Sequence, residues 1–349
     1  MTQPTDPSPD PADRPRRRRP GALALILAVT LGMGAFTVLV GLFLIDWPDG
    51  DGGLDRWTLI QLDPNAPFLP TLANADVGVG PNRLSFTVQD ERGRIRPDLT
   101  VRVALYDLAA DPNVPVLAQF AQFISFAAES PLPVQHQHAA GASLSDNARY
   151  VGAGIYVVPA YFPRGGTWGI EFTIAPAGDR FDEDEAEIVL FRLAVREQRA
   201  APVAGDAALA TPSRTLLDEP DLARLTSDPR PEPGLYQLSI DDALANGRPL
   251  LLVFATPAFC HSRTCAPALD VVKAVWRDHA ADLDAIHVEV FENPHEPSAL
   301  VESAAFLAWD LPSEPWVFLI DAAGVIVAAY EGSVTDRELR GDVEKLVGR

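Results

Sequence analysis

The chain has 349 residues, enough for about two domains, and hydrophobic residues make up 47% of it, which excludes a wholly disordered protein. Its 48 acidic and 28 basic residues give a formal net charge of −20, and this argues against nucleic acid as a partner because phosphate contacts need basic patches. The two cysteines, Cys260 and Cys265, are too few for a disulfide scaffold, and their closeness in sequence indicates a local site.

The first 45 residues predict a membrane anchor. Residues 1–20 are rich in Pro, Asp and Arg and predict a disordered cytoplasmic tail. Residues 21–45 carry no charge and would reach about 37 Å as a helix, more than the roughly 30 Å of a hydrocarbon core. Arginines before this segment and acids after it predict a single-pass signal anchor in the cell membrane, with a cytoplasmic N-terminus and extracytoplasmic C-terminal domains. A cleaved signal peptide is the alternative, but no A-x-A-like exit is visible.

The middle of the chain predicts antiparallel strands after a tether at 46–75. Apolar and polar residues alternate with period two in several short runs bounded by Gly, Pro and Asp. These runs are Arg83–Gln89, Leu99–Tyr106, Tyr150–Pro159, Thr167–Ile174 and Ile188–Val195. We therefore expect an all-β, immunoglobulin-like sandwich over 76–197. The segments 80–84 (GPNRL) and 166–170 (GTWGI) resemble the YtkA-like sandwich domains of bacterial envelope proteins.

Three polar segments surround these strands. His136 and His138 would face the same side of a strand and so could form a copper or zinc loop, but no cysteine, methionine or acid nearby completes a site, which favours a solvated loop. The acidic run 182–185 is more typical of a hairpin tip than of a calcium loop. Residues 198–233, with few aromatics, predict an interdomain linker.

From residue 235 onward, helical and strand patterns alternate. Helices are expected at 239–246, after Pro267, at 298–307 and at 335–347, and strands at 250–254, 285–290, 316–320 and 325–330. This order, with a cysteine at the strand-to-helix switch and Pro315 before the third strand, resembles the thioredoxin fold over 235–349. The predicted fold class is thus an α/β thioredoxin-like domain at 234–349 behind the all-β sandwich and a single N-terminal transmembrane helix.

The thioredoxin resemblance implies a redox site with a cis-proline loop. Pro315 is the candidate for a cis bond, and it is expected with Glu314 and Thr256 to contact the substrate. The buried acid that thioredoxins carry before the phenylalanine of the first central strand is replaced here by Val253, which removes the usual proton acceptor.

The spacing Cys260-x4-Cys265 departs from the usual Cys-x-x-Cys. Residues five apart on a regular helix have Cα atoms about 8–9 Å apart, beyond the limit of about 7 Å for a disulfide. A disulfide therefore needs Cys260 outside the helix, or an unwound first turn. The helix N-terminus, together with His261 and Arg263, would lower the pKa of the Cys260 thiol. The alternatives are two inert core cysteines, a surface histidine without a role at His261, and a solvated helix residue at Arg263.

Three functions are compatible with this pattern. The first is a membrane-anchored extracytoplasmic thiol–disulfide oxidoreductase in which Cys260 attacks and Cys265 resolves. It would act on exported protein thiols or disulfides with an unknown redox partner, and it needs no cofactor and no metal. The second is a thiol peroxidase, because peroxiredoxins of the bacterioferritin-comigratory type share the x4 spacing, although Thr256 lies one residue too far from Cys260 for their motif. The third is a non-enzymatic copper-handling protein, since Sco-type chaperones resemble this chain in placing a cysteine pair on a thioredoxin fold.

Overall fold

The computed structural model describes residues 55–58, 66–125, 154–178, 181, 186–260 and 264–348. Contacts along the chain define two compact units, Met1–Asp49 and Gly50–Arg349. The predicted membrane anchor, the His136 and His138 loop and the acidic run at 182–185 lie outside the described residues.

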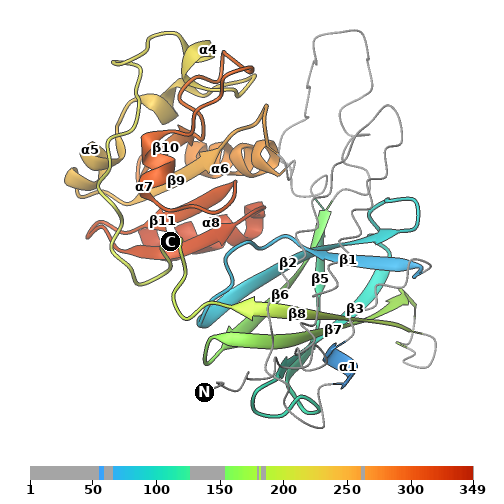
Figure 1. The fold of residues 1–349 in the computed structure, drawn as a ribbon. Helices are drawn as coiled ribbons and strands as arrows, with labels where there is room; N and C mark the ends of the chain where they lie inside the picture. The colour runs from blue at the N-terminus through green and yellow to red at the C-terminus, as the bar shows by residue number, and fades with distance from the viewer. Residues whose placement is uncertain are drawn as a thin grey trace, which may run out of the picture. The chain divides into compact units, whose positions relative to one another are not determined.

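Two four-stranded antiparallel sheets occupy the first half of the larger unit (Figure 1). One has the order β1-β2-β6-β5, formed by Phe68–Leu72, Gly80–Asp90, Gly154–Phe162 and Gln122–Ser125. The other has the order β4-β3-β7-β8, formed by Pro115–Phe120, Leu99–Asp107, Gly166–Pro176 and Glu187–Val195. Alternate residues of both sheets, among them Phe86, Val103 and Phe172, share one buried core. The five predicted strands correspond to β2, β3, β6, β7 and β8, while β1, β4 and β5 were not predicted.

Part of the expected tether is packed against these sheets. Trp57, in the short helix α1 (Asp55–Thr58), is fully buried beside Tyr106, with ring centroids 5.1 Å apart. A Cβ atom added to Gly169 would lie 2.6 Å from the Trp57 ring, so only a glycine fits there. Trp57 therefore attaches this part of the expected tether to the sheets.

A third sheet, of mixed direction, organises the C-terminal third. Its order is β10-β9-β11-β12, formed by Asp284–Glu289, Leu250–Ala255, Trp316–Ile320 and Ile326–Glu331. Strands β9 and β10 are parallel, whereas β11 is antiparallel to both β9 and β12. All six residues of β9 are buried, as expected for a continuous apolar run covered on both faces.

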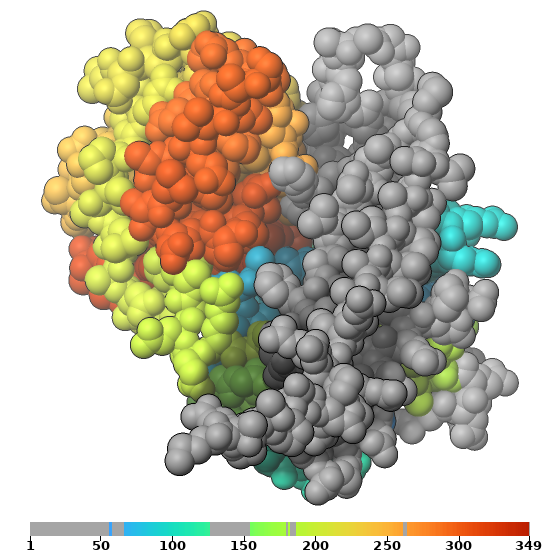
Figure 2. Space-filling view, in the orientation of Figure 1, coloured from blue at the N-terminus to red at the C-terminus, as the bar shows by residue number. Residues whose placement is uncertain are grey.

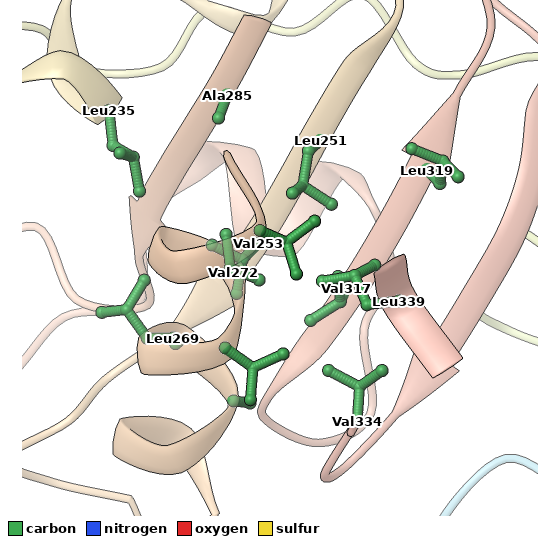
Figure 3. Packing of buried hydrophobic residues seen from close by; sticks show 14 of the residues in the cluster. Leu235, Leu251, Val253, Leu269, Val272, Ala285, Val317, Leu319, Val334 and Leu339 are labelled. Atoms are coloured by element: carbon green, nitrogen blue, oxygen red, sulfur yellow. The ribbon is translucent and has the colours of Figure 1, made fainter. Parts of the chain in front are cut away.

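Two cores cover the two faces of this sheet. Leu251, Val253 and Val317 point to the side of helix α6 (Cys265–His279), where they pack with Leu269 and Val272 (Figure 3). Leu252, Phe254 and Phe318 lie in the opposite core, which includes residues of α5 (Ile240–Ala245) and α7 (Ala304–Ala308). Helix α8 (Asp336–Val347) begins with a capping box between Thr335 and Glu338 and packs on the α6 side.

The predicted fold class is wrong for this chain. The described residues are mostly β-sheet with few helices, among which only α6 and α8 exceed six residues. In place of the predicted helix at 298–307 there is only the short α7, because the stretch before its N-cap Ser303 pairs with the segment after β10: Glu302 forms an antiparallel bridge with Phe291. Within the described ranges, no helix is long and apolar enough to cross a membrane. The predicted α/β thioredoxin-like fold class is therefore not the architecture found in the described residues.

The segment 198–233, expected to be a linker, is packed into the C-terminal region; in Figure 2 it is the yellow-green to yellow stretch beside the orange residues. It carries α4 (Leu222–Leu225) and leads into the 3₁₀ turn η1 (Pro233–Tyr236). Lys273 of α6 is buried and forms an ion pair with Asp228 of this segment, while its Nζ also donates to the carbonyl oxygen of Arg230 at 3.1 Å. A buried cation thus ties the segment to the helix.

Substituting Lys273→Met should lower the free energy of unfolding by about 3–5 kcal/mol, because it leaves the buried Asp228 carboxylate without its partner. Lys345 is the other lysine of the chain and is exposed, so Lys345→Met should change it by no more than about 0.5 kcal/mol. Urea unfolding of both variants measures the difference, and equal midpoints would contradict a stabilising role for the buried pair.

Candidate functional site

The candidate site lies at one edge of the third sheet, where three chain segments meet. Ala255 at the end of β9 pairs with Glu289 at the end of the parallel strand β10. Phe254 pairs with Trp316 at the start of the antiparallel strand β11. Strand direction therefore brings the segment after β9, the end of β10 and the segment before β11 to the same edge.

Cys260 and Cys265 form a disulfide with Cα atoms 6.0 Å apart, inside the normal bridging range. Helix α6 begins at Cys265, so Cys260 lies outside the helix in this disulfide-bonded form, which is compatible with both expected solutions to the x4 spacing. Cys260 is half-buried and Cys265 is fully buried. The backbone N–H of Cys265 donates to the Cys260 sulfur at 3.3 Å.

The helix N-terminus supplies part of the expected activation. Cys265 is the first residue of α6, so the backbone N–H groups of the first turn face the segment between β9 and α6 that carries Cys260, which we call the cysteine loop. A helix N-terminus favours the thiolate form of a cysteine. His261 and Arg263 fall outside the described residues, and their effect on the pKa of Cys260 stays a prediction.

The Glu314–Pro315 peptide bond is cis, which confirms the expectation for Pro315. Pro315 is buried and Glu314 is half-buried. One carboxylate oxygen of Glu314 and the sulfur atoms of Cys260 and Cys265 all lie within 4.8 Å of one another. The structure thus brings four of the predicted site residues to one place.

Thr256, the remaining predicted substrate-binding residue, lies in the interior. Its side chain is fully buried, and its hydroxyl lies 3.5 Å from the hydroxyl of Ser227. A fully buried side chain has no exposed atom with which to contact a substrate, so Thr256 is part of the interior next to the cysteine loop.

A buried carboxyl group that the sequence did not reveal lies under the cysteine loop. The Glu289 carboxylate accepts hydrogen bonds from the N–H and the hydroxyl of Ser227, both at 2.7 Å. The Ser227 hydroxyl oxygen in turn accepts the N–H of Ala258 at 3.2 Å, two residues before Cys260. Burial raises the pKa of Glu289 above its ordinary value, against the hydrogen bonds from Thr256 and Ser227 that lower it.

One signal in the sequence could have revealed Glu289. A strand expected to be buried carries polar residues at alternate positions, His287 and Glu289, which indicates buried hydrogen bonds. The partner Ser227 lies in the segment that composition assigned to a linker, so no pattern in the sequence connects the two residues.

His287 is buried as a neutral ring. Its Nε2 donates to the carbonyl oxygen of Ala255 at 3.0 Å, and its Nδ1 accepts from the hydroxyl of Tyr236 at 2.7 Å. Burial lowers the pKa of His287 to about 4. Both ring nitrogens therefore have a partner without a second proton, and the end of β9 next to the cysteine loop is held in place.

A cavity of about 200 Å³ lies along β10, at the edge of the sheet. Glu289, His287, Tyr236, Phe291 and Arg214 are among the residues that line it. The Phe291 ring packs edge-on against Phe259 with centroids 5.9 Å apart, so this cavity and the cysteine loop share a wall.

No family model matches this chain, and no curated protein is similar to it. The thioredoxin-like and YtkA-like resemblances therefore remain predictions from short motifs, and the function is argued from the site itself.

Stability should fall as the pH decreases from about 6.5 to about 4, because His287 takes up a proton in the unfolded chain but not in the folded protein over this range. This contributes up to about 3 kcal/mol of pH-dependent stability. The raised pKa of Glu289 acts in the opposite direction, so the comparison has to be made between variants.

Urea unfolding at pH 7 and pH 5 should show a smaller loss of stability for His287→Gln than for the wild type. His295→Gln, in a loop of the same region, is the matched control and should behave as the wild type. If all three proteins lose the same stability between the two pH values, His287 is not the group responsible.

Proposed function

We propose that this protein is a thiol–disulfide oxidoreductase in which Cys260 and Cys265 are the reacting pair. The observation that carries the proposal is the disulfide between a half-buried cysteine and a fully buried one, at the start of a helix and beside a cis-proline bond. A disulfide between residues five apart closes a short loop and constrains the unfolded chain less than one that closes a long loop, so stabilisation is a weaker reason for this pair.

The unequal burial assigns the two roles. A substrate can reach the sulfur of Cys260, whereas Cys265 is enclosed and a substrate cannot reach its sulfur directly. In the reducing direction, the Cys260 thiolate attacks one sulfur of a substrate disulfide and forms a mixed disulfide, and the other substrate sulfur leaves and takes a proton. The Cys265 thiolate then attacks Cys260, the second substrate thiol leaves, and two electrons have passed to the substrate. The oxidising direction is the reverse sequence.

The buried groups beneath the loop give it a fixed shape. Ser227 donates a hydrogen bond to Glu289, and its hydroxyl oxygen accepts one from the N–H of Ala258. These hydrogen bonds inside the core fix the backbone that leads to Cys260. We treat Glu289 as a positioning residue for the cysteine loop. A reactive cysteine benefits from such a fixed approach, because thiol–disulfide exchange needs the attacking sulfur in line with the bond it breaks.

The cellular setting is part of the proposal. Disulfide exchange of this kind suits an oxidising compartment. The arginines before residues 21–45 and the acids after them favour C-terminal domains outside the cytoplasm, with exported protein thiols or disulfides as substrates and a separate redox partner to restore the pair.

The direct test is trapping of mixed disulfides. Cys265→Ser should accumulate mixed disulfides between Cys260 and substrate thiols, because nothing resolves them, whereas Cys260→Ser should trap none. Non-reducing electrophoresis with mass-spectrometric mapping measures both. Turnover of peroxide at a rate above that of a disulfide substrate, lost in Cys260→Ser, would instead support the peroxidase alternative.

A second test separates positioning from chemistry at Glu289. Glu289→Ala should slow reduction of a disulfide substrate by about tenfold or more, because the Ser227 contact to the loop is lost. Glu289→Gln should recover most of the rate, since its amide oxygen still accepts from Ser227. Glu302→Ala, an exposed acid in the same region, is the control. Equal rates for the alanine and glutamine variants would contradict the positioning role.

A further inference from the structure

Three potential metal ligands converge at the redox pair. The two cysteine sulfurs and one oxygen of Glu314 lie within 4.8 Å of one another, and among the residues the structure describes no other group of three such side chains does so. They come from three separate backbone positions: the loop after β9, the first residue of α6 and the residue before the cis bond. Each is fixed by a different part of the fold.

We propose that the reduced form of this site binds one zinc ion through the Cys260 and Cys265 thiolates and the Glu314 carboxylate, and that disulfide formation releases it. Zinc–sulfur distances of about 2.3 Å and zinc–oxygen distances of about 2.0–2.2 Å place tetrahedral ligand atoms roughly 3.3–3.8 Å apart. The three ligand atoms lie within 4.8 Å of one another, so small movements of the side chains bring them to these separations. The inference goes beyond the proposed redox function.

Charge explains why the reduced site favours a divalent cation. When the disulfide is reduced, two thiolates and one carboxylate compete for a small space, and their mutual repulsion opposes ionisation of the thiols. A divalent ion removes this repulsion and lowers the pKa of a coordinating thiol. Thiolates select zinc or copper(I), and the carboxylate oxygen in the set favours zinc over copper(I). Three protein ligands leave a fourth position for water or substrate.

The release step balances. The two zinc-bound thiolates pass two electrons to a substrate disulfide, which takes up two protons and leaves as two thiols, while Cys260 and Cys265 become a disulfide and zinc leaves unchanged as Zn²⁺. A disulfide sulfur carries no negative charge for the ion, so the oxidised site holds only one anionic ligand.

The test is a titration of the full-length chain with Zn²⁺ under anaerobic conditions, with a coloured chelator as competitor. The reduced chain should bind one zinc ion more than the oxidised chain, and this difference also removes any contribution from histidines elsewhere. Co²⁺ in place of Zn²⁺ should give a sulfur-to-metal charge-transfer band in the reduced form only.

Glu314→Gln should weaken this redox-dependent binding at least tenfold, and Cys265→Ser should abolish it. Glu302→Gln, an exposed acid, should bind as the wild type does. Equal binding by reduced and oxidised chains, or an unchanged affinity in Glu314→Gln, would overturn the inference. Disulfide turnover measured on zinc-free protein separates the two claims: turnover without zinc binding removes only this inference, and zinc binding without turnover removes only the proposed redox function.

Discussion

The position of β9 between two neighbours of opposite direction is the constraint on which the site depends. Because β10 runs parallel to it and β11 antiparallel, the end of β9, the end of β10 and the start of β11 share one edge. The burial of β9 on both faces fixes this register, since a shift by one residue would exchange the two cores. Strand direction therefore brings the cysteine loop, Glu289 and Pro315 together.

The predictable parts of the structure were those encoded locally. The apolar run at 250–254 and the alternating runs of the first half indicated strands because burial on one or both faces leaves a direct pattern in the sequence. The cysteine pair was likewise recognisable from its position in the sequence, whereas the cis bond was expected from the resemblance to thioredoxins. The overall fold class was not recognisable, because the pattern that allows a helix at 298–307 yielded only the short α7, whereas the short helix predicted at 239–246 is present as α5. The contribution of Ser227 was hidden, since a Pro- and Asp-rich composition describes a docked segment and a free linker equally well.

Beneath the cysteine loop, burial acts on titratable groups in three different ways. It lowers the pKa of His287 and raises that of Glu289, and in both cases it disfavours the charged form. Lys273 keeps a buried ion pair instead, because Asp228 and Asp270 are both close to its ammonium group. Each of these polar groups has a specific partner, and the partners come from the segment 198–233, from η1, from α6 and from the neighbouring strand β9. The interior therefore links the reactive edge to a part of the chain that is distant in sequence.

That same segment also protects the sheet from unwanted association. Backbone groups of Gly205, Asp206 and Ala208 hydrogen bond to Ile326 and Gly324 at the start of β12, one border strand of the sheet. The turn η1 contacts β10, the opposite border strand. An exposed border strand offers unpaired N–H and C=O groups on which a second chain can add a strand and begin to aggregate. The backbone at the start of β12 is already hydrogen bonded and cannot pair with a second chain. A chain that lacks residues 1–233 would expose this backbone, and so become less soluble, and would also lose Ser227 and Asp228.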